Sequence, residues 1–311
     1  MPKGFFSQGI AVLLSKPVTI HSIEKVLKES FEITNVKDSS EQWVFSGPSL
    51  LIPYRPEENG YIQVDVVENP WPDEMGDPAE DTTLFGAWTM GFFGPHTYPQ
   101  NLERAAQQAW GYPEGRQAVA EHTAFIRVRS SYTLGQVDDQ VPMLPEDYDP
   151  FPELLFVGAV AETLLQMPEA LCYFNPNGES LASAELMQEL NQRYEETQLP
   201  PLELWSNVRL FNLPEEWLMM DTIGMLQLDA IDHEAIFHRD ACDPNEVAGF
   251  LRNISNYVYE NGPVIKEGDT TDGPGGIRWQ STLLDEGLTS PPRGVIRWYP
   301  LDGREKPAGL E

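Results

Sequence analysis

Basic residues are scarce in this chain of 311 residues, which has 20 Lys and Arg against 49 Asp and Glu and a formal net charge of −29. Nucleic acids and anionic membranes would repel such a surface, so we expect it to bind no nucleic acid and no membrane. Cysteine is scarce as well. Cys172 and Cys242 are too few for a disulfide framework and favour a reducing compartment.

Long hydrophobic runs are also missing. No stretch of about 18 apolar residues occurs, which excludes a membrane-spanning helix. The first eight residues lack the pattern of a secretory signal, so we expect a cytoplasmic protein. The composition is 41% hydrophobic and 11% aromatic, which is enough to build a large core and excludes a wholly disordered chain.

The order of the expected elements indicates an α+β fold. The apolar run 9–14 predicts a buried strand, and apolar positions from Ile23 to Phe31 have helical spacing. Strands are expected at 49–54 and 61–67, joined through the hairpin dipeptide Asn59-Gly60. We expect two α+β halves, each a mostly antiparallel sheet with helices packed on one face. The similar order of elements in the halves allows a diverged duplication.

A Pro-rich acidic stretch at 142–152 is the expected linker between the halves. The N-terminal half would then span 1–141 and the C-terminal half 153–311. The first half contains a long irregular insertion at 69–115, rich in Pro, Gly and aromatic residues. Long segments of this kind are often functional.

The densest group of potential metal ligands surrounds His233 and His238. A metalloprotease helix places its two histidines four residues apart, but here the spacing is five. On a strand an odd spacing directs the two rings to opposite faces, and on a helix it separates them by about 140°. We therefore expect no metal site and no cofactor.

Other weak motifs have structural explanations. The glycine-rich segment 267–276 lacks the lysine of a phosphate-binding loop and is expected to be a surface hairpin. Ser22 and Lys25 have the spacing of some acyl-transfer nucleophiles, but they lie in the first turn of an expected helix. Cys172 lies in an apolar strand, where an inert thiol is expected. We therefore expect no catalytic residue from these motifs.

Acidic and aromatic residues gather in the insertion, where no Lys or Arg occurs between Arg55 and Arg104. The segment 85–94 alternates large aromatic residues with glycine, and two interpretations stay open. It fills the core, because exposed aromatic patches harm solubility, or it forms a platform for a partner, because aromatic residues dominate interface hot spots. For a contact surface we select five carboxylates and an aromatic anchor: Asp73, Glu74, Asp77, Glu80, Asp81 and Trp88.

Several segments together resemble a known family. The stretches 12–17, 124–128 and 165–183 are similar to its strands and turns, as is Leu204-Trp205. The strongest similarity lies in Asp221-Thr222-Ile223-Gly224-Met225, in the block 232–236, and in Gly262 to Gly268 with the Asp269-Thr270 that follows. These segments resemble bacterial proteins grouped as domain of unknown function 4261. The similarity covers most of the chain, is strongest from 120 to 280, and weakens at 69–115.

The resemblance implies a fold rather than a reaction, because the family has no established catalytic residues. It also implies a role, since some members resemble immunity proteins encoded beside secreted toxins. We therefore expect a cytoplasmic immunity protein, or antitoxin, that neutralises a toxin such as a type VI secretion effector or a nuclease by binding it directly. An acidic inhibitor suits a basic toxin cleft, as in the barnase–barstar pair.

Two other functional classes stay open. The protein could be an enzyme or a metabolite-binding protein whose site is assembled from scattered carboxylates such as Glu121, Asp221 and Glu234, because active-site residues need only meet in space. It could also be a scaffold component of a larger assembly. The sequence does not settle the oligomeric state.

Overall fold

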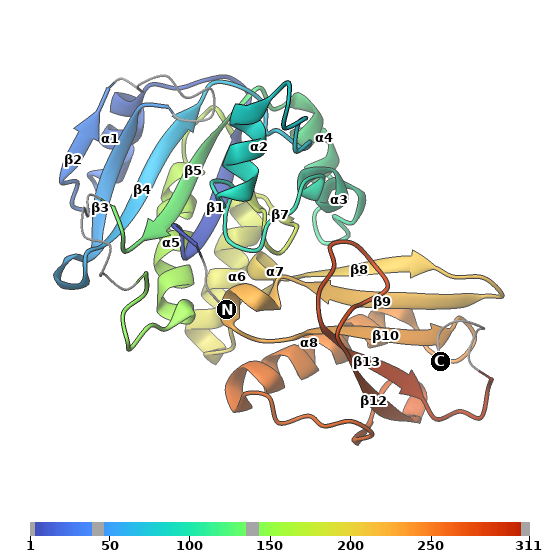
Figure 1. Cartoon of the computed structure of the whole chain (residues 1–311). Coiled ribbons are helices and arrows are strands. Elements are labelled where there is room, and N and C mark those ends of the chain that lie inside the picture. The colour runs from blue at the N-terminus through green and yellow to red at the C-terminus, as the bar shows by residue number, and fades with distance from the viewer. Residues whose placement is uncertain (1–3, 39–46, 135–142, 306–311) are drawn as a thin grey trace. The chain divides into compact units, whose positions relative to one another are not determined.

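A computed structural model describes residues 4–38, 47–134 and 143–305 (Figure 1). The chain forms two compact units, Met1–Thr197 and Gln198–Glu311. Each unit contains its own sheet together with helices, so the α+β class predicted from the sequence is confirmed. None of the helices within the described ranges is long and apolar enough to cross a membrane.

The first unit is built on a seven-stranded sheet in the order β2-β3-β4-β5-β1-β6-β7, in which every pair is antiparallel. Its strands are β1 (Gln8–Leu14), β2 (Asn35–Lys37), β3 (Ser49–Arg55), β4 (Gly60–Val67), β5 (Ala124–Ser131), β6 (Ala170–Asn175) and β7 (Ser180–Ala182). β1 is buried along its whole length and lies between β5 and β6. The apolar run at 9–14 is therefore a central strand, as its composition predicts.

Helices cover both faces of this sheet (Figure 1). They are α1 (Ile20–Leu27), α5 (Pro150–Leu164) and α6 (Ala184–Thr197) on one side, and α2 (Thr82–Thr89), α3 (Asn101–Gln107) and α4 (Gly115–Glu121) on the other. Leu13 and Phe125 pack in one core cluster with Trp88 of α2, whereas Ser130 hydrogen-bonds Glu153 of α5 from the opposite face. The expectation of helices on one face is wrong for this unit, because the central strand β1 is buried on both faces.

The boundary between the units also differs from the predicted linker. The stretch 143–149 leads directly into α5, whose N-terminus is capped by the Asp149 carboxylate accepting a hydrogen bond from the Phe151 N–H. α5 then packs on β1 and β5, and β6 pairs with β1, so these elements complete the first sheet. The division comes after Thr197 instead of at 142–152. The Pro-rich acidic stretch therefore leads into the start of a helix and does not mark a domain boundary.

The second unit has a six-stranded sheet in the order β11-β12-β13-β10-β9-β8, with β10 and β13 parallel and the other pairs antiparallel. Its elements are α7 (Leu202–Trp205), β8 (Asn207–Asn212), β9 (Trp217–Ile223), β10 (Asp232–His238), α8 (Pro244–Asn261), β11 (Thr270–Asp272), β12 (Arg278–Leu284) and β13 (Val295–Pro300). Short 3₁₀ turns occur at Pro56–Glu58, Met225–Leu228 and Pro274–Gly276. α8 covers one face of the sheet, where it shares a core cluster with Phe237 and Trp298.

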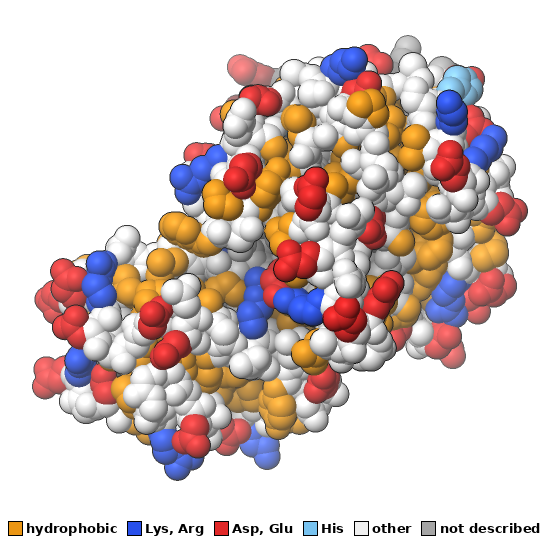
Figure 2. Space-filling view, turned by 180° about the vertical axis from the view of Figure 1, so that it is seen from behind, with side chains coloured by type: hydrophobic (Ala, Val, Ile, Leu, Met, Phe, Trp, Pro, Cys, Tyr) orange, Lys and Arg blue, Asp and Glu red, His pale blue; other side chains and the backbone are white. Residues whose placement is uncertain are grey.

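Each sheet contains a buried carboxylate held by two arginines. In the first unit Asp65 accepts hydrogen bonds from Arg127 and Arg129, the latter at 2.9 Å from Nη2. Burial would raise the pKa of Asp65, but the two guanidinium groups outweigh this effect and hold the pKa below its usual value. In the second unit Asp221 is bound by Arg209 at 2.6 Å and by Arg293 at 2.7 Å. These arginines are turned inward, whereas acidic side chains are spread over the molecular face in Figure 2.

We expect Asp65→Ala to destabilise the first unit by about 3–5 kcal/mol, because two buried arginines would lose their counter-charge. Urea unfolding followed by circular dichroism measures the change. The control is Glu80→Ala, an exposed carboxylate that should alter stability by about 0.5 kcal/mol or less. Equal stability of the two variants would show that the buried ion pair is not needed for the fold.

Candidate functional site

Residues 68–121, which make up most of the connection from β4 to β5, form a helical layer over one face of the first sheet, and we call them the acidic layer. Its exposed carboxylates are those of Glu68, Glu74, Asp77, Glu80, Asp81, Glu103, Glu114 and Glu121. The same stretch contains two basic residues. Arg116 is exposed, whereas Arg104 is turned towards the buried carboxylate of Glu179. The acidic layer therefore presents eight carboxylates and one guanidinium to solvent.

Carboxylates also define where the helices of this layer begin. Asp81 caps α2, because its Oδ1 accepts the Leu84 N–H at 3.2 Å. Asp73 accepts the N–H groups of Leu102 and Glu103 at 2.9 and 2.7 Å and so holds the first turn of α3. Asp73 is half-buried, and burial raises the pKa of its carboxyl. Asp73 is thus a structural residue at the margin of the predicted surface.

The other four predicted carboxylates lie close together on the exposed side. The backbone N–H groups of Glu80 and Asp81 both donate to the Asp77 carbonyl, so these three residues share one tight turn. Glu74 is exposed a few residues earlier in the chain. The structure therefore brings Glu74, Asp77, Glu80 and Asp81 into one region.

Trp88 does not belong to this surface. Its side chain is 5% exposed, and its Nε1 donates to the Glu74 carbonyl at 3.0 Å. The ring packs on Phe93, with a centroid separation of 4.4 Å, and contacts Trp71 edge-on. Of the two interpretations of the aromatic segment, the structure supports the one in which it fills the core. The prediction of Trp88 as an exposed anchor is wrong.

The most exposed aromatic side chain among the described residues of the acidic layer is Trp110, which is 61% exposed and lies three residues beyond the end of α3. Tyr98 and Met90 are each 42% exposed in the same layer. The sequence contains a signal for Trp110. It lies directly before Gly111, where the helical pattern of apolar residues ends and no core position is expected.

We expect Trp88→Ala to lower the free energy of unfolding by about 3–5 kcal/mol, because it leaves a large cavity among Trp71 and Phe93. Trp110→Ala should cost less than about 1 kcal/mol, since most of its ring is already in water. Thermal and urea unfolding of both variants measure these costs. If Trp88→Ala changed the free energy of unfolding only slightly, Trp88 would again be a candidate for the contact surface.

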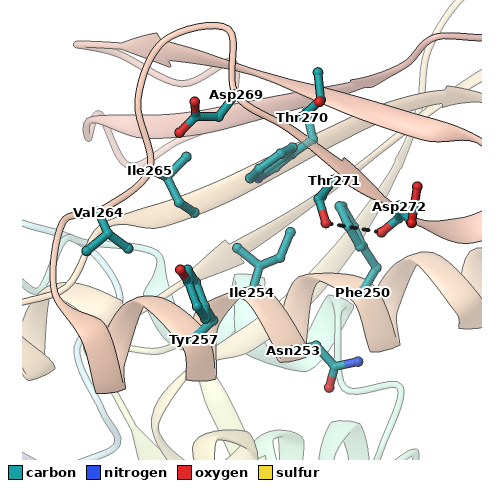
Figure 3. Close-up of a pocket in the computed structure, with 11 residues that line it drawn as sticks. Phe250, Asn253, Ile254, Tyr257, Val264, Ile265, Asp269, Thr270, Thr271 and Asp272 are labelled. Carbon is teal, nitrogen blue, oxygen red and sulfur yellow. Dashed lines mark hydrogen bonds between the residues drawn. The ribbon is translucent and has the colours of Figure 1, made fainter.

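A second candidate site is a pocket of about 630 Å³ in the second unit, between α8 and the edge strand β11 (Figure 3). Its lining consists of Phe250, Asn253, Ile254, Tyr257, Val264, Ile265, Asp269, Thr270, Thr271, Asp272 and Trp298. α8 supplies one wall, and the chain that leaves α8 for β11 closes one end. The volume lies in the range of small-molecule sites.

The carboxylates of the enzyme hypothesis are divided between the two units. Glu121 is exposed in the first unit and accepts a hydrogen bond from Gln117. Asp221 and Glu234 are neighbours on β9 and β10, but both are buried and already bound. Glu234 accepts Arg297 Nε at 2.8 Å and the Leu288 N–H at 2.7 Å, while Asp221 is held by the two arginines described above. These contacts make the two carboxylates structural.

The histidine pair follows the strand geometry predicted for it. β10 directs His233 to the α8 face, where its Nδ1 accepts a hydrogen bond from the Trp298 indole N–H at 3.4 Å. His238 lies on the opposite face against Trp217. Burial lowers the pKa of His233 to about 3, so the ring is neutral at physiological pH. Within the described ranges, no three His, Cys, Asp or Glu side chains are grouped so that they could hold a metal ion.

Both cysteines are free and buried. Burial raises the pKa of the Cys172 thiol to about 12, which keeps it protonated at neutral pH, and Cys242 lies in the other unit. Ser22 lies in the first turn of α1, where its N–H donates to the Thr19 hydroxyl. The segment 270–284 forms the hairpin of β11 and β12 that the glycines predict. None of these four features forms a catalytic arrangement.

Glu153 is a buried acid that the sequence analysis did not select. Its carboxylate accepts hydrogen bonds from the hydroxyl groups of Ser7, Ser130 and Tyr148 at 2.9, 2.5 and 2.8 Å. Burial raises the pKa of Glu153, and these hydrogen bonds oppose the effect without reversing it. The burial of Glu153 depends on the packing of α5 against β1 and β5, which no local sequence pattern indicates.

The pKa of Glu153 predicts a pH dependence of stability. Because the pKa is raised on folding, the stabilisation is complete below the ordinary value of 4.5 and is lost as the pH rises through the folded-state pKa. Relative to Glu153→Gln, wild-type protein should therefore lose free energy of unfolding as the pH rises above 4.5. Urea titrations of both proteins at a series of pH values measure this difference. A difference independent of pH would contradict the assignment.

Comparison with known proteins identifies a family in the second unit. Residues 221–299 match the family model described as Domain of unknown function (DUF4261). No curated protein and no solved structure matched the chain. The matched range runs from β9 to β13 and contains every residue that lines the second-unit pocket, while the similarity noted at 124–128 lies outside it. The segment 221–299 is therefore similar to the family of domain of unknown function 4261.

Proposed function

We propose that this protein is an immunity protein that binds a basic toxin through the acidic layer and thereby blocks the toxin. The observation that carries the proposal is the charge of that layer, which exposes eight carboxylates against the single guanidinium of Arg116. Carboxylates this close together repel one another in the free protein. A cationic partner relieves that repulsion, and opposite charge also accelerates association and discriminates against other partners.

Exposed apolar side chains within the same layer supply the contact that charge alone does not give. Trp110, Tyr98 and Met90 are large and partly or mostly exposed, and Trp is among the residues enriched in hot spots. Asp73 holds the start of α3, and Trp110 lies just beyond its end. Seven helical residues span about 10 Å, so both ends of α3 fit within one interface of standard size.

The resemblance to immunity proteins encoded beside secreted toxins supports the choice of partner. A toxin that attacks nucleic acid needs a basic cleft to hold phosphates, and the acidic layer would compete for that cleft. We therefore propose a nuclease toxin, delivered by a secretion system such as type VI, as the partner. Neutralisation by binding requires no catalytic group in the immunity protein.

The test uses any toxin found to be encoded beside this gene, together with a variant that carries Glu74→Gln, Asp77→Asn, Glu80→Gln and Asp81→Asn. Asn also caps helices, so α2 should persist. We expect slower association of this variant, and a salt dependence weaker than that of wild type, with little change in dissociation. Trp110→Ala should instead accelerate dissociation by about 30-fold, corresponding to about 2 kcal/mol. Surface plasmon resonance separates the two rates.

The matched control places four amides on α6, on the opposite side of the same sheet, through Glu185→Gln, Glu189→Gln, Glu195→Gln and Glu196→Gln. It removes the same charge and should bind and protect sensitive cells like wild type. If the two quadruple variants behave alike, the acidic layer is not the interface. If wild-type protein neither binds the toxin nor protects cells that express it, the immunity function is refuted.

A further inference from the structure

The second-unit pocket combines an aromatic floor with an acidic rim (Figure 3). Trp298 of β13 is 2% exposed, and Phe250 of α8 packs on it edge-on at a centroid distance of 5.7 Å. Ile254 extends the floor between Phe250 and Tyr257. Tyr257 is 51% exposed, and its hydroxyl points towards the cavity. A ligand there would meet aromatic faces as well as an aliphatic side chain.

The pocket forms because α8 does not cover the whole sheet. β11 is the edge strand, and the chain between α8 and β11 passes beside the helix instead of over it. Thr271 faces the hollow on the same side of the sheet as Trp279, its cross-strand partner. The floor is therefore fixed by the core of the unit, and one side stays open for a ligand to enter.

Every charged side chain in the lining is acidic. Asp269 directly precedes β11, Asp272 is the last residue of β11, and the lining contains no Lys or Arg. Asp272 has a distant partner in Arg278, at 4.0 Å. Asp269 uses Oδ2 to accept the Lys266 N–H at 2.8 Å and has no ion pair within the described part of the chain. The Asp269 carboxylate is exposed, so its charge is available to a ligand.

These features select one class of ligand. Anions are repelled by the rim, and a neutral apolar molecule gains nothing from the carboxylates. A cation with an apolar body suits both the aromatic floor and the acidic rim. Aromatic faces attract ammonium groups, and a carboxylate of the rim forms an ion pair with the ammonium group. We propose that this pocket binds a small organic amine, with the ammonium group beside Asp269 and the apolar body against Ile254 and Trp298.

This binding function is separate from the acidic layer. The pocket lies entirely within residues 221–299, the segment that matches the family, whereas the acidic layer lies in the first unit. A negative result for toxin binding would therefore not contradict the amine site, and a negative result for amine binding would not contradict the immunity function.

The test titrates the full-length protein with three probes of similar shape and different charge: 2-phenylethylamine, 2-phenylethanol and phenylacetate. Ligand-observed NMR measures the three dissociation constants. We expect saturable binding of the amine, at least tenfold weaker binding of the alcohol, and no binding of the acid. Equal binding of amine and alcohol, or no binding of the amine, would overturn the proposal.

Variants locate the binding. Asp269→Asn keeps an acceptor for the Lys266 N–H and should raise the dissociation constant of the amine at least fivefold. The control is Asp285→Asn, which changes an exposed carboxylate on the β12–β13 connection and should leave this constant unchanged. Thr271→Trp should fill the hollow and abolish binding. Unchanged affinity in a folded Asp269→Asn or Thr271→Trp protein would place the amine elsewhere and overturn the proposal. So would a blocked Phe-Lys-Phe peptide that binds tenfold more tightly than the amine, because the site would then recognise protein chains.

Discussion

Pairing of buried arginines with buried carboxylates is the interaction on which both sheets depend. In each unit two adjacent strands place an aspartate opposite an arginine, Asp65 opposite Arg127 and Asp221 opposite Arg209. Removing one member would leave a charge in a medium of low dielectric constant, so the pairs constrain which strands can be neighbours. In the first unit the contact also fixes the acidic layer, because Arg127 and Arg129 both donate to the Phe92 carbonyl within that layer.

The same pairing shapes the surface. Among the residues that the structure describes, five of the chain's 20 basic residues are buried arginines, namely Arg127, Arg129, Arg209, Arg293 and Arg297. Their charges are neutralised inside the molecule and cannot balance carboxylates that face solvent. A chain with few cations has thus placed a quarter of them in its interior. The acidity of the helical layer is therefore a consequence of how the core is built as well as of composition.

Local patterns were sufficient to predict much of the fold. The apolar run of β1, the Asn59-Gly60 hairpin and the spacing along α1 each specify their element without help from distant residues. The unit boundary could not be found in this way, because it depends on β6 pairing with β1 across more than 150 residues. Trp88 shows the same limit at the site. Glycines and acidic neighbours surround it in the sequence, but its burial comes from Trp71 and Phe93. The pocket likewise depends on α8 leaving part of a sheet uncovered, which no local pattern records.

The lengths of the outermost strands have a further consequence. β2 and β7, the edges of the first sheet, and β11 in the second have three residues each. Long unpaired edges can recruit strands from other molecules, and short ones offer too few backbone groups to do so. Along these three edges, association by strand addition is therefore disfavoured, which protects the protein against edge-to-edge aggregation. Recognition at these three edges must then rely on side chains, where evolution can change specificity without altering the sheets.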